Sequence, residues 1–319
     1  MALRIRDLRE DNDHETREET LSRLLSTMAL EEKVGQLFFA RCPETDGAAL
    51  AQQYHLGGYL LFGRDFKNKS ADEVRDAIDG CQNAVQISLL IGADEEGGTV
   101  VRISSNPQLR ETPFLSPQQL YAQGDMEAIL TDTAEKDALL RSLDVNVNFA
   151  PVADLSENLE DFIYQRAFGQ GPEETSQFTA AVAAQMERDD MGNVLKHFPG
   201  YGSNPDTHTG SALDSRPLDQ FLTRDFLPFR AGIEAAPGGT AAVLVSHNVI
   251  QAVDPNLPAS LSPAVLDLLR EKLGFDGVAL TDDLAMEAVE KGQITSERLD
   301  QAVTRVLGWK YDLGLLEGL

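Results

Sequence analysis

The chain has 319 residues, of which 42% are hydrophobic and 25% charged, so it can bury a large core and is not disordered as a whole. Its formal net charge of −25 argues against nucleic acid and anionic membrane surfaces as partners, because both need a clustered positive field. The sequence contains no run of about 18 apolar residues, which is the length needed to span a membrane. The charged N-terminus has no apolar segment typical of a secretory signal, so we expect a cytoplasmic protein.

Short apolar segments alternate with longer helical patterns along the chain, which is typical of βα units and a parallel sheet. The predicted strands are 34–40, 58–62, 89–93, 145–154, 194–198, 241–246 and 277–281. The predicted helices are 71–85, 175–190, 262–273 and 296–313, and residues 1–32 are expected to form a helical extension.

Polar or charged residues follow most of the predicted strands, where the catalytic groups of an α/β barrel lie. No glycine-rich phosphate loop follows the first strand, as it would in many doubly wound sheets. We therefore predict an α/β fold, a (β/α)8 TIM-type barrel, with residues 1–319 as a single catalytic domain. No apolar strand pattern follows residue 283, so this barrel is expected to be irregular or to lack a regular eighth strand.

The segment KHFPGYGSNPDTH, residues 196–208, is the most specific in the chain. It contains two of the five histidines, together with a lysine and an aspartate, and it leads from a predicted strand into a loop. A carboxylate next to an imidazole can orient it as a general acid and base near neutral pH. We interpret Asp206 and His208 as such a pair.

Three other segments carry groups suited to sugar chemistry, and from position alone the groups in each have two interpretations. Asp282 follows the strand 277–281 and is either a nucleophile toward an anomeric carbon or a helix cap. Asp94 and Arg102 either bind sugar hydroxyls or form a structural salt bridge. Arg166, in the segment QRAFG, is either a ligand-binding group or a surface arginine.

An ordered series of motifs carries a resemblance to a known family. The motifs are MALEEKVGQLFFA (28–40), GGYLLFGRDFKN (57–68), ADEEGGTVVRI (93–103), NFAPVADL (148–155), QRAFG (165–169), KHFPGYG followed by PDTH (196–208), SHNVI with PASLSP, GFDGVALTDDLAM (274–286) and RVLGWKYDLGLL. The chain resembles glycoside hydrolase family 3, and within it the single-domain β-N-acetylhexosaminidases. Tyr201 stands where many relatives have a second histidine.

The resemblance implies a retaining mechanism through a covalent glycosyl-enzyme. Asp282 then matches the nucleophile and His208 the acid/base, with Asp206 orienting it. The positions that match those holding the sugar are Asp94, Arg102, Arg166, Lys196 and His197.

The implied substrate is a small glycoside with terminal β-linked N-acetylglucosamine, such as a cell-wall recycling fragment or a chitooligosaccharide. The sequence implies no metal or organic cofactor, because its acidic residues are scattered over separate strand ends rather than grouped as ligands. It predicts neither a nucleic acid nor a membrane partner and no particular oligomeric state. A family 3 β-glucosidase or β-xylosidase is less compatible, because such enzymes typically take their acid/base from a second domain. A β-N-acetylglucosaminide phosphorylase and a non-catalytic sugar-binding relative remain as alternatives.

Overall fold

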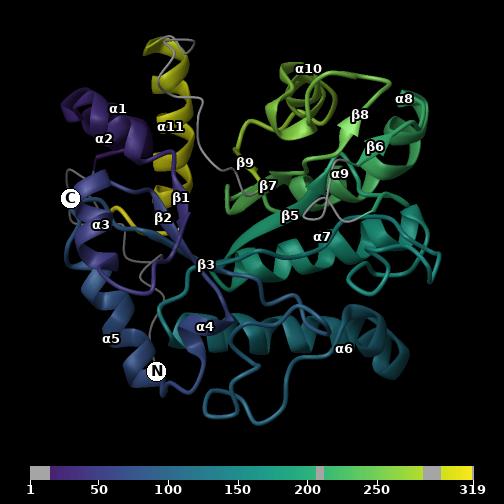
Figure 1. Ribbon diagram of the computed structural model, residues 1–319, viewed down its shortest axis with the longest axis horizontal. Helices are drawn as coiled ribbons and strands as arrows, with labels where there is room; N and C mark the ends of the chain where they lie inside the picture. Colours follow the sequence, from purple (N-terminus) through teal and green to yellow (C-terminus); the bar gives the residue numbers. More distant parts are fainter. Residues whose placement is uncertain (1–14, 206–211, 283–295, 318–319) are drawn as a thin grey trace.

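The computed structural model describes residues 15–205, 212–282 and 296–317. Its main sheet has seven strands, all parallel, in the order β1-β2-β3-β4-β5-β7-β9. These strands are β1 (Phe39–Arg41), β2 (Gly58–Leu61), β3 (Leu90–Ala93), β4 (Val147–Asn148), β5 (Gly192–Phe198), β7 (Ala241–Val245) and β9 (Val278–Thr281). A separate two-stranded sheet pairs β6 (Leu213–Asp214) with β8 (Val249–Ile250). The seven strands curl into an arc, and helices pack around it (Figure 1).

The helices are α1 (Arg17–Thr27), α2 (Leu30–Gly35), α3 (Gly47–Tyr54), α4 (Gly63–Phe66), α5 (Ala71–Gln82), α6 (Pro117–Ser142), α7 (Pro172–Arg188), α8 (Leu218–Gln220), η2 (Phe221–Asp225), α9 (Phe226–Glu234), η3 (Ala259–Leu261), α10 (Pro263–Asp267), η4 (Leu268–Lys272) and α11 (Ser296–Asp312). None of the helices in the described ranges is long and apolar enough to cross a membrane.

The central strands are buried along their whole length because helices cover the outside of the arc. Every residue of β3, β5 and β7 is buried, as the continuous apolar runs predict for a parallel sheet. α7 packs against β5, and α6 and α9 pack against α7. The buried strands place the residues that follow them at one end of the arc.

The α/β fold and the parallel order of the seven predicted strands are confirmed, with corrections at element boundaries. The predicted strand 34–40 is wrong in its first part, because residues 34 and 35 end α2 and the strand begins at Phe39. Of the predicted strand 145–154, only Val147–Asn148 pairs as a strand in the main sheet. Helix α6 was not predicted, and its backbone is non-helical at Gly124 and Asp125, where two helical segments meet at a kink.

No strand among the described residues joins β9 to β1, which agrees with the prediction of an irregular barrel. Helix α11 contacts β9 as well as α1 and α2. The indole Nε1 of Trp309 donates to the carbonyl oxygen of Thr240 at 3.0 Å, next to β7. On the other side, Lys310 Nζ donates to Gln36 Oε1 at 2.6 Å. Helix α11 therefore ties together the two ends of the arc, where a closed barrel would have paired strands.

Candidate active site

The carboxyl end of the parallel strands brings together five of the eight residues predicted for the site. Asp94 comes directly after β3, while Lys196 and His197 belong to the end of β5, two strands away. Arg102 follows the turn after β3, and Arg166 reaches in from the segment between β4 and α7. This is the edge at which α/β barrels collect their catalytic groups.

Lys196 lies at the centre of a buried ion cluster. Its Nζ is 2.7 Å from Asp94 Oδ1 and 2.5 Å from Glu96 Oε1, and the lysine is only 1% exposed. Arg166 binds the same glutamate through two hydrogen bonds, Nη2 to Oε1 at 2.7 Å and Nε to Oε2 at 3.0 Å. Both cations are thus paired with carboxylates of this chain, and they are held in fixed positions.

The charge balance of the cluster is reflected in the ionisation of Glu96. Burial by itself would raise the pKa of this carboxyl, but the positive charges of Lys196 and Arg166 outweigh it and lower the pKa to about 2. Glu96 is therefore an anion at any physiological pH. The sequence offered a signal for it in the strand-end motif DEEGG, but nothing there distinguished it from its neighbours.

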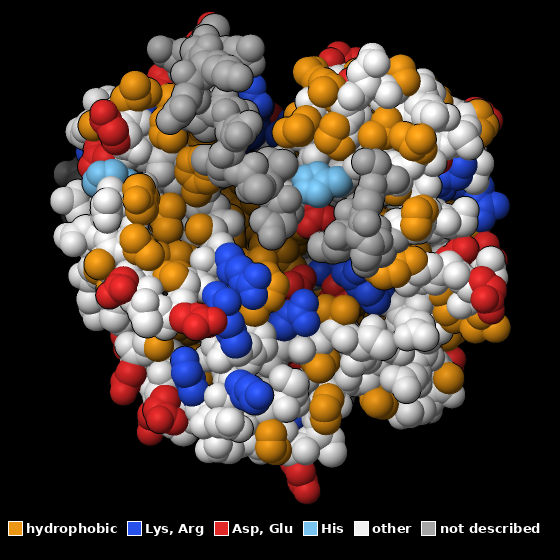
Figure 2. Space-filling view, in the orientation of Figure 1, with side chains coloured by type: hydrophobic (Ala, Val, Ile, Leu, Met, Phe, Trp, Pro, Cys, Tyr) orange, Lys and Arg blue, Asp and Glu red, His pale blue; other side chains and the backbone are white. Residues whose placement is uncertain are grey.

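Asp94 is held between two cations. Besides its contact with Lys196, its Oδ2 lies 3.5 Å from Nη2 of Arg102. The Arg102 guanidinium lies over the ring of Phe62, 5.7 Å from its centroid, and that of Arg41 lies over the same ring at 4.3 Å. Figure 2 shows Lys and Arg side chains gathered near the middle of this face. Asp94 is half-buried, so its carboxylate can still accept hydrogen bonds from a ligand.

His197 is fixed through both of its ring nitrogens. Nδ1 lies 2.7 Å from Oδ2 of Asp154, and Nε2 lies 3.2 Å from Nη2 of Arg166. Asp154 is almost fully buried and also accepts the backbone N–H groups of His197 and Tyr201, at 3.1 and 2.7 Å. The sequence indicated Asp154 only as a strand-end carboxylate, and its role toward His197 follows from tertiary structure.

The remaining three predicted residues were the proposed catalytic ones. Asp282 follows β9, is half-buried, and its backbone N–H donates to the carbonyl oxygen of Val245 at 3.1 Å. Asp206 and His208 lie outside the described residues.

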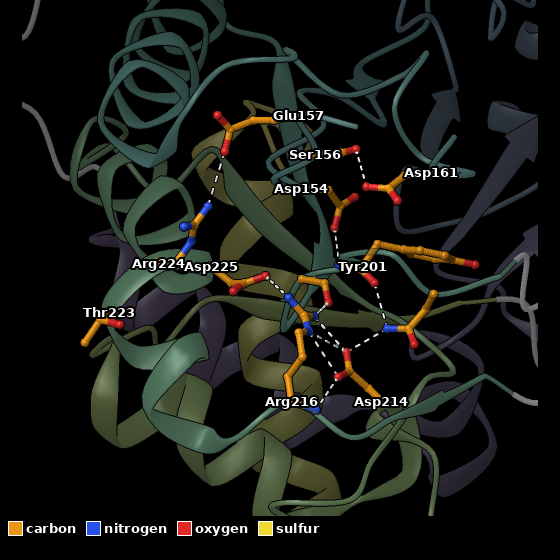
Figure 3. A network of polar contacts seen from close by, with 12 residues as sticks. Asp154, Ser156, Glu157, Asp161, Tyr201, Asp214, Arg216, Thr223, Arg224 and Asp225 are labelled. Atoms are coloured by element: carbon orange, nitrogen blue, oxygen red, sulfur yellow. Dashed lines mark hydrogen bonds and ion pairs between the residues drawn. The ribbon is translucent and has the colours of Figure 1, made fainter. Parts of the chain in front are cut away.

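The chain on both sides of residues 206–211 is anchored by Arg216 (Figure 3). Its guanidinium donates to Asp214 Oδ2 and Asp225 Oδ1, each at 2.7 Å, and to the carbonyl oxygen of Gly200 at 2.9 Å. Asn204 Nδ2 donates to Asp214 Oδ2 at 2.6 Å from the other flank. The network therefore ties residues 200–204 to residues 214–216, and no motif in the sequence indicated it.

Burial also dominates the ionisation of Asp225 in this network. It raises the pKa of the Asp225 carboxyl to about 6, although the Arg216 charge opposes the shift. The network borders a hollow of about 350 Å³. Its lining residues include Ser156, Asp161, Ser203, Gln220 and Arg224.

Comparison with known proteins identifies the family. The glycosyl hydrolase family 3 N terminal domain matches residues 29–308. The chain belongs to glycosyl hydrolase family 3. A protein from Stenotrophomonas maltophilia strain R551-3 named beta-hexosaminidase is 37% identical over 242 residues, which are 73% of this chain and 69% of the relative.

Solved structures agree with this family assignment. A glycoside hydrolase family 3 beta-N-acetylglucosaminidase from Paenibacillus sp. has a TM-score of 0.81 at 26% identity. That match covers 92% of this chain but only 64% of the Paenibacillus protein, so this chain spans less than two thirds of it. A beta-N-acetylhexosaminidase from Beutenbergia cavernae matches with a TM-score of 0.70 at 26% identity, covering 89% of this chain and 92% of that protein.

The donor set of this family 3 site suits a neutral polyhydroxyl ligand. Its partly accessible groups are the Asp94 carboxylate and the guanidinium groups of Arg102 and Arg166, which ion pairs already align and which need little reorganisation to bind hydroxyls. Within the described ranges, no three His, Cys, Asp or Glu side chains are grouped so that they could hold a metal ion.

Proposed function

We propose that the chain is a retaining β-N-acetylhexosaminidase that releases terminal β-linked N-acetylglucosamine from small glycosides. The observation that carries this proposal is the preorganised cluster at the ends of β3 and β5, in a chain of family 3 whose relatives include named beta-hexosaminidases. Suitable substrates are chitooligosaccharides and cell-wall fragments. Such substrates end in a sugar with many hydroxyl groups, which these side chains can bind.

The sugar in this proposal is held by five residues. Asp94 accepts hydrogen bonds from its ring hydroxyls, and Arg102, Arg166, Lys196 and His197 bind hydroxyls and the N-acetyl group. Lys196 and Arg166 are rigid donors, because Glu96 fixes both of them. Rigid donors lose little side-chain entropy when a ligand binds.

Catalysis in this proposal takes two displacements at the anomeric carbon. The Asp282 carboxylate attacks this carbon while His208 protonates the departing glycosidic oxygen, which gives a covalent glycosyl-enzyme and a free alcohol. His208 then takes a proton from water, whose oxygen attacks the same carbon and releases Asp282. Asp206 orients the His208 ring in both steps. Two inversions retain the β configuration.

The test is hydrolysis of an aryl N-acetyl-β-glucosaminide by the wild type and by the variants Asp282→Ala, His208→Ala and Asp283→Ala. We expect the first two to lose at least about 100-fold in kcat, and Asp283→Ala, the matched neighbouring acid, to lose much less. Full activity of Asp282→Ala would refute the nucleophile, and an inactive but folded wild type would favour the non-catalytic alternative.

Two further measurements separate hydrolysis from related reactions. Proton NMR of the first-formed sugar is expected to show the β anomer, and the α anomer would refute retention. Rates with and without inorganic phosphate are expected to be equal. Formation of the sugar 1-phosphate would instead assign the phosphorylase activity, in which phosphate replaces water as the acceptor.

A further inference from the structure

Asp154 is a buried carboxylate that lies against His197, one of the residues proposed to hold the sugar. It is 1% exposed and lies in the segment after β4, which runs beside the end of β5. The backbone N–H of Ala153 donates to the carbonyl oxygen of Lys196 at 2.7 Å, so the two segments are locked together one residue before Asp154. The backbone just before Asp154 therefore holds this residue against the end of β5.

The two oxygens of Asp154 accept three hydrogen bonds. Oδ2 accepts from the backbone N–H of His197 at 3.1 Å and lies 2.7 Å from the ring Nδ1 of the same residue. Oδ1 accepts from the backbone N–H of Tyr201 at 2.7 Å, which is visible in Figure 3. An ionised carboxylate has no proton to donate, so the short contact with Nδ1 requires the proton to be on Nδ1.

The contact of the second ring nitrogen, Nε2, independently indicates the same tautomer. Nε2 of His197 faces Nη2 of Arg166 at 3.2 Å, and a guanidinium is only a donor. A proton on Nε2 would place two donors against each other. Arg166 itself cannot turn away easily, because two hydrogen bonds hold it to the buried Glu96. The Nδ1–H tautomer is the one that satisfies all of these contacts.

We propose that Asp154 is a positioning residue that fixes His197 as the Nδ1–H tautomer, so that Nε2 accepts from Arg166 and holds its guanidinium in the site. Through its second oxygen, the same carboxylate holds the turn at Tyr201, which leads from β5 into the segment before residue 206. The consequence for the reaction rests on the proposed function, in which His197 and Arg166 contact the substrate. The tautomer itself does not depend on it.

The arrangement passes from Asp154 through His197 to Arg166. Nε2 has one lone pair, and the contact with Nη2 of Arg166 uses it, so the His197 ring helps to orient the guanidinium. Asp154 would thereby act on the sugar through His197 and Arg166 without touching the substrate.

The first experiment reads the tautomer directly and needs no activity. Protein labelled with ¹⁵N-histidine is examined by two-bond ¹H–¹⁵N NMR, and the His197 signals are assigned by their loss in His197→Ala. We expect the Nδ1–H pattern in the wild type and a mixed or Nε2–H pattern in Asp154→Ala. A predominant Nε2–H pattern in the wild type would overturn the proposal, whatever the enzyme does.

The second experiment asks whether Asp154 acts through His197. We expect Asp154→Ala to lower kcat/KM for the aryl glycoside by about 10- to 100-fold, as residues that orient a ligating histidine commonly do. In the His197→Ala background the same substitution should cost less than about 3-fold, because coupled residues are not additive. Equal losses in both backgrounds would overturn the proposal.

Two variants guard against a purely structural effect. Asp161→Asn changes a carboxylate in the same segment that accepts from Ser156 Oγ at 2.8 Å and does not touch His197, so its tautomer and kcat/KM should match the wild type. Asp154→Asn keeps the size of the side chain and can still accept at one oxygen. It is expected to fold even if Asp154→Ala does not. Its amide oxygen can accept from Nδ1–H of His197 and so retain this tautomer, while its NH₂ group then faces the backbone N–H of Tyr201. Loss of the Nδ1–H pattern in both Asp154→Asn and Asp161→Asn would show that the tautomer depends on general packing, which contradicts the proposal.

Discussion

Replacing Glu96 by glutamine should weaken the fold by an amount that the structure allows to be worked out. The Glu96 carboxyl has a pKa of about 2 in the folded protein, against an ordinary value of 4.5. Because the folded pKa is the lower one, the carboxylate stabilises the fold above pH 4.5, and this contribution is lost as the pH falls toward 2. The shift corresponds to about 3 kcal/mol, similar to the loss of about 3–5 kcal/mol when one partner of a buried ion pair is removed.

The assay is urea unfolding at pH 7, followed by the fluorescence of the single tryptophan, Trp309, which is buried in α11. Glu96→Gln should lower the free energy of unfolding by about 3 kcal/mol, and the gap to the wild type should narrow below pH 4.5. Glu135→Gln is the matched control, because this glutamate pairs with Arg110 at the surface, where such pairs contribute at most about 1 kcal/mol. A loss in Glu96→Gln no greater than in Glu135→Gln would refute the reasoning.

Three further variants test other buried charges. Burial and the neighbouring Asp189 raise the pKa of Asp137 to about 8, so the folded protein binds this proton more tightly and its stability falls as the pH rises toward 8. The stability of Asp137→Asn relative to the wild type should therefore increase between pH 5 and 8. A difference in urea midpoint that stays constant over this range would contradict the reasoning. Burial lowers the pKa of Lys310 to about 7, so wild-type stability should rise with pH above 7. Lys310→Met should melt above the wild type by the largest margin near pH 6. At high pH the wild-type lysine is neutral and still donates to Gln36, a hydrogen bond that the variant lacks, so the margin should disappear. Arg216→Met leaves the buried carboxylates of Asp214 and Asp225 without a counter-charge and should lower the free energy of unfolding by about 3–5 kcal/mol, which a second substitution, Asp225→Asn, should partly restore.

The strand order was predictable because each strand is a short apolar run that must be covered on both faces. The segments that form β3, β5 and β7 are buried at every residue, which a parallel sheet covered on both faces provides. Strands that follow one another in the chain usually lie next to each other in such a sheet, so the order in space follows the order in the chain. Boundaries were less predictable where apolar residues continue past the paired segment. Val34 is apolar but ends a helix, and the segment after β4 follows the end of β5 through only isolated contacts.

The site was predictable as a set of positions, but its pairings were not. Lys196 and Arg166 are distant in sequence from Glu96, and only the parallel strands bring their ends into contact. The sequence indicated three cations for a ligand, while the structure pairs each of them with a carboxylate. Helix α11 is similar, because its apolar pattern predicted a helix but not its contacts with both ends of the sheet.

This pairing explains how a chain with a net charge of −25 can present cations at one place. An isolated buried lysine or arginine would pay a large desolvation cost, and burial with Asp94 and Glu96 removes most of it. The same pairing leaves the cluster nearly neutral, so its attraction for a ligand comes from aligned hydrogen-bond donors and acceptors rather than from net charge. A neutral sugar loses little by entering such a site, whereas a free anion would have to compete with carboxylates already in place. We therefore expect the cluster to favour a hydroxyl-rich ligand even though the residues that form it are charged.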